Sequence, residues 1–139
     1  MTYTFPSDEW LQQFKDALNG EPGKAWQEAA AEWEGSFLFV VESDATLSET
    51  VYLFIDLWHG QCRTVSFHKE GDTLPEADAQ FKGAYGNWVK LLKGEIDLIK
   101  GMLMRKFKLA GNKGKVMRGA QAAKELVATA KSLDTVFLQ

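Results

Sequence analysis

The spacing of apolar residues predicts two helices within residues 1–33. The first begins after Ser7, a residue type that caps helix N-termini, and its large apolar residues recur three or four positions apart, at Trp10, Phe14, Ala17 and Leu18. Gly20 and Pro22 end this helix. The second helix, over residues 23–33, carries an apolar face made of Trp26, Ala29, Ala30 and Trp33.

The pattern then becomes that of strands. Residues 36–42 and 50–58 are rich in Val, Ile, Phe and Tyr, which favour strands. Gly60 allows a turn into a third strand over residues 61–68, and residues 77–83 predict a weaker fourth strand, with Ala79 and Phe81 on one face. Because these strands follow one another through short connections, antiparallel pairing is expected.

Helical spacing returns over residues 84–104, with Gly94 inside the series, so two short helices with a break at Gly94 are expected. Residues 105–110 alternate basic and apolar side chains as a fifth strand would, and a long last helix is expected over residues 113–132. This order predicts one domain over residues 1–139, an α/β fold of the α+β two-layer sandwich type. Its parts are helices in 1–33, strands in 34–83, and helices with a fifth strand in 84–139. Together they place helices over a five-stranded, mainly antiparallel sheet.

Composition fits a globular protein, with 45% apolar and 12% aromatic residues in 139 positions. The single cysteine, Cys62, excludes an internal disulfide and a cysteine metal site. The N-terminus does not resemble a secretory signal, and no apolar run approaches the roughly 20 residues that span a bilayer. A cytoplasmic location is therefore expected.

Charge is unevenly distributed, although the net charge is only −3. Residues 1–50 carry ten acids and two bases, whereas residues 100–118 carry seven bases and no acid. Phe107 is the only aromatic residue in the basic segment, and nucleic-acid sites usually interleave more of them, so no nucleic-acid partner is expected. A solvated face is the plain interpretation. Transient contact with anionic membranes through Arg105–Arg118 is a further hypothesis.

Catalytic chemistry has few candidates. No nucleophile motif accompanies the two histidines, His59 and His68, and Cys62 has no evident partner base. His59 and Cys62 have a suggestive metal-ligand spacing but no further ligands nearby. We therefore predict no catalytic residues, no metal and no cofactor. An enzyme that uses Asp56 or His59 stays open as a less favoured hypothesis.

One run near the C-terminus resembles a known family. The residues Lys106-Phe-Lys-Leu-Ala-Gly-Asn112, followed by Lys-Gly-Lys-Val-Met117, resemble the C-terminal signature of the sterol carrier protein 2 family. Upstream, Asp56-Leu57, Gly60, Ala77-Asp78, Trp88 and Lys93-Gly94 also resemble the family's pattern. The likeness covers about residues 32–132, and its specificity comes from the order and spacing of short motifs.

The resemblance implies an SCP2-like fold, with a five-stranded sheet, helices over one face, and an apolar tunnel between them. It also implies binding of sterols, fatty acids, acyl-CoAs or phospholipids without catalysis, and possible intracellular transfer of such lipids. An alternative is an accessory module that presents an apolar substrate to a partner enzyme. Neither the natural ligand nor the oligomeric state follows from the residues.

Candidate lining residues are the large apolar side chains of the expected helices and strands. From the residues alone an ordinary core is the favoured interpretation for several of them, because apolar stripes mostly fill cores. A mouth is expected near Gly94 and Gly101. The expected lining comprises Phe37, Phe39, Phe54, Trp88, Leu91, Leu92, Ile96, Ile99, Leu103, Met104 and Met117.

Overall fold

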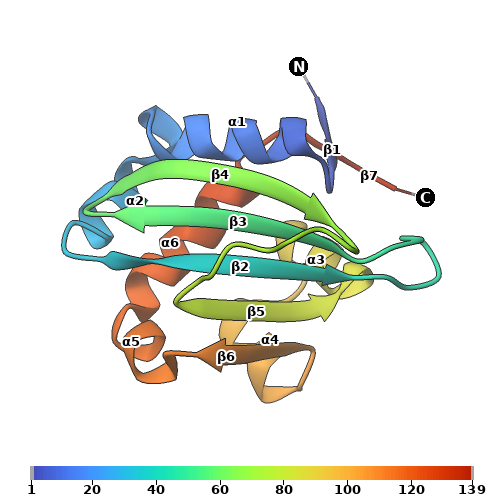
Figure 1. Ribbon diagram of the computed structural model, residues 1–139. Coiled ribbons are helices and arrows are strands. Elements are labelled where there is room, and N and C mark those ends of the chain that lie inside the picture. The colour runs from blue at the N-terminus through green and yellow to red at the C-terminus, as the bar shows by residue number, and fades with distance from the viewer. Residues whose placement is uncertain (1, 139) are drawn as a thin grey trace.

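The computed structural model describes residues 2–138. Five strands form the main sheet, in the order β4-β3-β2-β5-β6: β2 (Glu34–Glu42), β3 (Val51–Trp58), β4 (Gln61–Lys69), β5 (Ala79–Ala84) and β6 (Phe107–Gly111). Helices lie behind this sheet in Figure 1, and α1 runs along its upper edge. The predicted α+β sandwich is confirmed.

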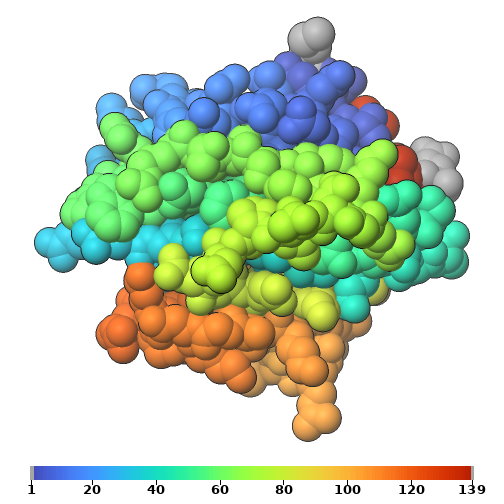
Figure 2. Space-filling view, viewed as in Figure 1, coloured from blue at the N-terminus to red at the C-terminus, as the bar shows by residue number. Residues whose placement is uncertain are grey.

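One pairing differs from the expectation for sequential strands. β5 pairs with β2 in parallel, whereas the other three pairs of the main sheet are antiparallel. The reason is the connection over residues 70–78, which crosses the front of β3 and β2 before β5 begins (Figures 1 and 2). After crossing the sheet, the chain runs in the same direction as β2 and pairs with the edge of β2 opposite β3.

Side chains alternate between the two faces of the sheet, as strand geometry requires. In β3 the residues facing the helices are buried, at Val51, Leu53, Ile55 and Leu57. The intervening residues point to the other face and are partly or fully exposed, at Tyr52, Phe54, Asp56 and Trp58. The main core therefore lies between β3, its neighbours and the helices.

The helical layer consists of α1 (Asp8–Leu18), the 3-10 turn η1 (Glu21–Gly23), α2 (Lys24–Ala29), α3 (Tyr85–Leu92), α4 (Leu98–Leu103), α5 (Lys113–Arg118) and α6 (Ala120–Lys131). Ser7 caps α1 as predicted, because its Oγ accepts a hydrogen bond from the Trp10 N–H at 3.1 Å. Within residues 2–138, none of the helices has the length and apolar character that crossing a bilayer requires.

Glycines break the helical segments at two places. Gly94, with φ of +78°, separates α3 from α4, which confirms the predicted break. The long helix expected over residues 113–132 is wrong, because it divides at Gly119 into α5 and α6. A Cβ at residue 119 would lie 2.7 Å from the Trp33 ring. The indole thus packs directly on the backbone at the division.

Two short strands were not expected from the sequence. β1 (Tyr3–Phe5) and β7 (Thr135–Phe137) form a parallel pair away from the main sheet. With three residues each, they are too short to produce a recognisable alternation. Their pairing brings Phe5 against Trp10, with ring centroids 4.8 Å apart, so both ends of the described chain close one side of the core.

Candidate functional site

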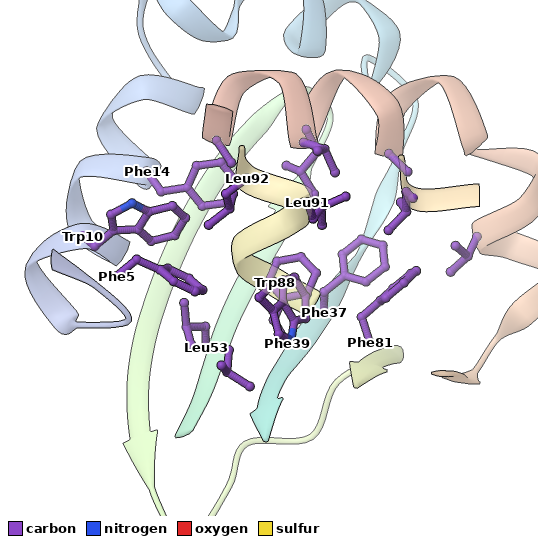
Figure 3. Close-up of a pocket in the computed structure, with 17 residues that line it drawn as sticks. Phe5, Trp10, Phe14, Phe37, Phe39, Leu53, Phe81, Trp88, Leu91 and Leu92 are labelled. Atoms are coloured by element: carbon purple, nitrogen blue, oxygen red, sulfur yellow. The ribbon is translucent and has the colours of Figure 1, made fainter. Parts of the chain in front are cut away.

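A narrow apolar cavity of about 60 Å³ lies between the inner face of the sheet and the helices. Figure 3 shows its aromatic side chains converging from the strands, α1 and α3. The lining comprises Phe5, Trp10, Phe14, Phe37, Phe39, Val41, Leu53, Phe81, Trp88, Leu91, Leu92, Leu98, Val116, Ala123, Leu126, Val127 and Ala130.

Aromatic contacts build the wall of this cavity on the sheet side. Phe37 and Phe39 stack, with ring centroids 5.7 Å apart, because residues two apart on β2 share a face. Trp88 of α3 meets Phe39 edge-on at 5.5 Å and Phe107 edge-on at 5.0 Å. Trp88 thus joins the helical layer to β2 and β6.

The indole N–H groups at the cavity are satisfied by the protein itself. Trp88 Nε1 donates to the carbonyl oxygens of Val40 and Gly83, both at 3.1 Å. Trp10 Nε1 donates to Thr135 Oγ1 at 2.9 Å. Since the remaining lining side chains are aliphatic or phenyl groups, the wall offers a ligand hydrocarbon contact and no polar side-chain group.

The end of the cavity near β1 is closed by aromatic residues. Phe5 stacks with Tyr85 at 6.2 Å and also contacts the Phe137 ring. The Tyr85 hydroxyl accepts a hydrogen bond from the Leu138 N–H at 2.8 Å, and burial raises the pKa of this hydroxyl above its usual value. The C-terminal segment is therefore fastened to the start of α3.

A second, larger space of about 710 Å³ forms a groove beside α4, α5 and α6. Its lining includes charged residues of both signs: Glu95, Asp97, Lys100, Lys124, Glu125 and Lys131. The groove and the cavity share six apolar residues, so the two spaces adjoin through one layer of side chains. The shared residues are Phe81, Leu91, Leu98, Val116, Ala123 and Val127.

The expected lining residues divide among three locations. Five line the cavity: Phe37, Phe39, Trp88, Leu91 and Leu92. Four others line the groove, where three of them are well exposed: Ile96, Ile99, Met104 and Met117. Phe54 and Leu103 belong to neither lining.

Phe54 was expected in the cavity lining but lies outside it, and the geometry of the strand explains why. Phe54 pairs with Leu38 and Ser66 on the face of the sheet away from the helices, whereas its neighbour Leu53 lines the cavity. An error of one residue in strand parity moves a side chain to the opposite face. Leu103 is also misplaced by the sequence interpretation, since it ends α4 with 78% of its surface exposed.

Residues from both ends of the chain were missed as lining residues. Trp10 and Phe14 of α1 and Val127 of α6 were visible as members of apolar stripes, but a stripe does not reveal whether it faces a filled core or a cavity. Phe5 and Ala130 carried no such signal. Their place in the site follows from the packing of β1 and α6.

The apolar tunnel implied by the family resemblance is not seen as a through-passage. Ligand pockets usually measure roughly 300 to 1,000 Å³. At about 60 Å³, the cavity is far smaller, and an apolar space of this kind stays dry. In this conformation the space between the helices and the sheet is too small for a hydrocarbon chain.

The candidate catalytic residues take part in local contacts outside the cavity. His59 Nε2 lies 2.6 Å from Glu34 Oε2, with both side chains about half exposed. Arg63 donates to both carboxylate oxygens of Asp56 at 3.0 and 3.1 Å and lies over the Trp58 ring. Neither Asp56 nor His59 belongs to the lining of the cavity.

Cys62 has no nucleophilic character in this fold. Burial raises the pKa of its thiol to about 12, which keeps it protonated at neutral pH. Across residues 2–138, no group of three or more His, Cys, Asp or Glu side chains is arranged to hold a metal ion.

Solved structures of other proteins share this arrangement of sheet and helices. The crystal structure of a sterol carrier protein 2 is 30% identical, with a TM-score of 0.81, and covers 91% of this chain and 97% of its own. A protein from Thermus thermophilus, described as possibly a sterol carrier protein, is 29% identical, with a TM-score of 0.80, and covers 94% of this chain and 90% of its own.

A third structure, the apo form of sterol carrier protein 2 from Yarrowia lipolytica, shares the fold at 20% identity and a TM-score of 0.57, covering 92% of this chain and 94% of its own. Comparison with curated protein sequences finds no match. The SCP-2 sterol transfer family matches residues 12–124, from α1 to α6, and so includes most of the cavity wall. The chain therefore belongs to the SCP-2 sterol transfer family.

Proposed function

We propose that this protein binds the hydrocarbon part of a lipid between the sheet and the helices and carries it without chemical change. The observation that supports this most directly is the lining, which consists entirely of apolar side chains with their indole N–H groups already bonded to the protein. Such a wall recognises shape and apolar surface, so fatty acids, acyl-CoAs, sterol-like molecules and phospholipids are all candidate ligands.

Binding requires the cavity to enlarge, and α4 is the element that moves in this proposal. Gly101 is the only fully buried residue of α4, and only Leu98 and Met102 add partly buried contacts with the core. Positive φ angles at Gly94 and Arg105 flank it, at +78° and +59°. Outward movement of α4 would join the cavity to the adjoining groove of about 710 Å³, which lies within the usual range for ligand sites.

The available free energy is sufficient for useful affinity. Burial of apolar surface yields about 25 cal/mol per Å², so a tail burying about 300 Å² gains about 7.5 kcal/mol. A dissociation constant of 1 μM corresponds to about −8.2 kcal/mol. Affinity near the micromolar range therefore needs few polar contacts, and broad selectivity among lipids is expected.

Titration with a fluorescent fatty acid tests this proposal. Ala123 lies in both linings, so Ala123→Phe should fill the junction between cavity and groove and weaken probe binding at least tenfold. Ala25→Phe adds the same ring at an exposed position of α2 and serves as the control. A wild-type protein that binds no amphiphile, or an Ala123→Phe protein that binds as well as wild type, would contradict the proposal.

Two further measurements address ligand identity and the carrier role. Mass spectrometry of lipid extracted from the purified protein identifies what it holds. Movement of a fluorescent lipid between vesicles, accelerated by the protein, supports transfer. Binding without transfer, together with co-purification of a stable partner enzyme, would instead support the alternative of an accessory module.

A further inference from the structure

Exposed apolar side chains gather at one end of the molecule. Ile99, Leu103, Met104 and Met117 have 46%, 78%, 61% and 54% of their surface exposed. They come from α4, the turn after it, and α5. This end forms the lower edge of Figures 1 and 2, where the light-orange turn between α4 and β6 projects. Large apolar groups in such number are costly to leave in water.

Basic side chains occupy the neighbouring surface. A hollow beside the groove is lined by five bases, with Glu42 as the one acid: Lys82, Arg105, Lys106, Lys108 and Lys113. Met102 and Met117 line both this hollow and the groove. The apolar and basic side chains therefore adjoin beside the groove, whose own lining balances three acids with three bases, so the excess of positive charge lies in the hollow. We call this surface of α4, β6 and α5 the docking face.

The charges of the docking face are not neutralised within the protein. In the described part of the chain, the ion pairs within 4.0 Å are His59–Glu34 and Arg63–Asp56, and neither belongs to this face. Lys115, at its border, lies over the Trp33 ring at 5.3 Å. The basic groups are thus available to an external anion.

We propose that the docking face binds the surface of an anionic lipid bilayer and turns the mouth of the groove toward it. An anionic bilayer complements both features, because its head groups attract the bases and its interface accepts the apolar side chains. A single-stranded nucleic acid fits less well, since stacking needs exposed aromatics and Phe107 is only 3% exposed. The proposal rests on the lipid-carrying function, for which it supplies a route between membrane and cavity.

Cosedimentation with vesicles is the primary test. Wild-type protein should bind vesicles of equal parts phosphatidylcholine and phosphatidylglycerol, should bind phosphatidylcholine vesicles weakly or not at all, and should lose binding as salt rises. Each basic group near such a surface strengthens binding roughly fivefold, so removing three should weaken it on the order of a hundredfold. The test variant combines Lys106→Gln, Lys108→Gln and Lys113→Gln, three of the bases that line the hollow.

Matched variants separate the contributions. Lys24→Gln, Lys69→Gln and Lys90→Gln together remove the same charge from exposed positions outside the docking face, and this triple variant should bind nearly as wild type does. Leu103→Ser should weaken binding severalfold at low salt, because it removes the most exposed of the apolar side chains. Leu103 lines neither the cavity nor the groove, so fatty-acid probe binding in solution should stay unchanged.

A fluorescent label reports which surface meets the bilayer. Cys62 is only 2% exposed, so an introduced surface cysteine can be labelled selectively in the folded protein. A polarity-sensitive dye at Met104→Cys should shift to the blue on anionic vesicles. The same dye at Thr73→Cys, in the crossing segment on the other side of the sheet, should not shift.

Three results would overturn the proposal. These are absence of binding to anionic vesicles, equal binding by wild type and the Lys106, Lys108 and Lys113 variant, or binding of a single-stranded oligonucleotide without binding of vesicles. If the lipid-carrying function itself is wrong, the fluorescent fatty acid does not bind the protein in solution, whether or not the protein binds vesicles. The two failures are therefore distinguishable.

Discussion

At the scale of single residues, the ring of Phe107 is the point at which β5, β6 and α4 meet. The ring lies between two glycine backbones. An added Cβ would come within 2.6 Å of it at Gly83 of β5 and at Gly101 of α4. Both glycines are required here because a side chain at either position would occupy the place of the ring.

Substitution at Gly83 should therefore destabilise the whole fold. In Gly83→Ala the new methyl group meets the ring and also the carbonyl oxygen of Lys106 at 2.9 Å. Overpacking of this kind costs about 1–3 kcal/mol, measurable by urea unfolding. Gly114→Ala is the control, since its nearest neighbour is the flexible end of Arg118 at 3.5 Å. Equal stability of the two variants would contradict the steric argument.

A second residue, Asp44, links the loop after β2 to the start of α3. Its carboxylate accepts hydrogen bonds from the backbone N–H groups of Leu47 at 3.0 Å, Thr46 at 2.8 Å and Gly86 at 2.8 Å. The bond from Leu47 contributes most to lowering the pKa of Asp44 below its usual 3.8, and burial opposes this shift. Folding therefore favours the charged carboxylate.

The sign of the pH dependence follows from that shift. Because the folded pKa of Asp44 lies below the unfolded value, its contribution to stability is present above pH 3.8 and is lost as the pH falls through the folded pKa. Asp44→Asn should flatten this part of the acid-unfolding curve. Its cost at neutral pH should stay below about 1 kcal/mol, because the group is exposed. Asp16→Asn, at an exposed position of α1, should leave the curve unchanged.

At the scale of elements, α4 differs from the helices that pack firmly on the sheet. α1 buries five residues and α6 buries four, whereas α4 buries only Gly101. Asp97 stabilises its start by accepting a hydrogen bond from the Lys100 N–H at 2.7 Å. A helix with formed caps and little buried surface is well suited to move as a unit.

Gly101→Ala should loosen α4 in particular. The methyl group would press on Phe107 from the α4 side, so amide exchange over residues 98–103 should accelerate and a fatty-acid probe should associate faster. Gly83→Ala crowds the same ring from β5 and should not accelerate association. If the two variants show the same association rate, α4 is not the moving element.

At the scale of the whole molecule, the apolar cavity adjoins the groove across one layer of side chains, and the fold is closed at the other end by β1 and β7. The groove opens on the side that carries the basic residues of 100–118, whereas the acidic residues of 1–50 belong to α1, α2 and β2 and their connections. The two proposals, ligand access through the groove and contact with an anionic bilayer, therefore concern the same end of the molecule.

Ligand binding should stabilise the entire molecule. At a free fatty-acid concentration 100 times its dissociation constant, linkage adds about 2.7 kcal/mol. For a chain of 139 residues this raises the unfolding temperature on the order of 10 °C, measurable by calorimetry. Ala123→Phe should show a much smaller rise at the same concentration. An equal rise would mean that the ligand binds elsewhere.

Local patterns in the sequence were enough to predict most elements. Ser7 and the stripe at Trp10 and Phe14 predicted α1, and the glycine at 94 predicted the break between α3 and α4. These features depend on neighbours within a few residues. The face of the sheet on which each strand residue lies was harder to predict. In β3 large apolar side chains occur on both faces, as Phe54 and Leu53 show.

Other features depend on contacts between distant residues. Trp33, far away in the chain, lies so close to Gly119, where the last helix divides, that a side chain there would meet its ring. β5 runs parallel to β2 because its connection crosses the sheet rather than turning back beside β4. No periodicity within either segment contains this information.

The sequence by itself thus determined the kinds of elements, their order, the one-sided basic charge and the likeness to the SCP-2 family. Only the tertiary structure decided which apolar stripes surround a space, how small that space is, and which of the expected residues lie outside it. The physical reason is that an apolar side chain gains about the same free energy by leaving water in a filled core or in a cavity wall. Its sequence pattern is the same in both cases, and packing alone distinguishes them.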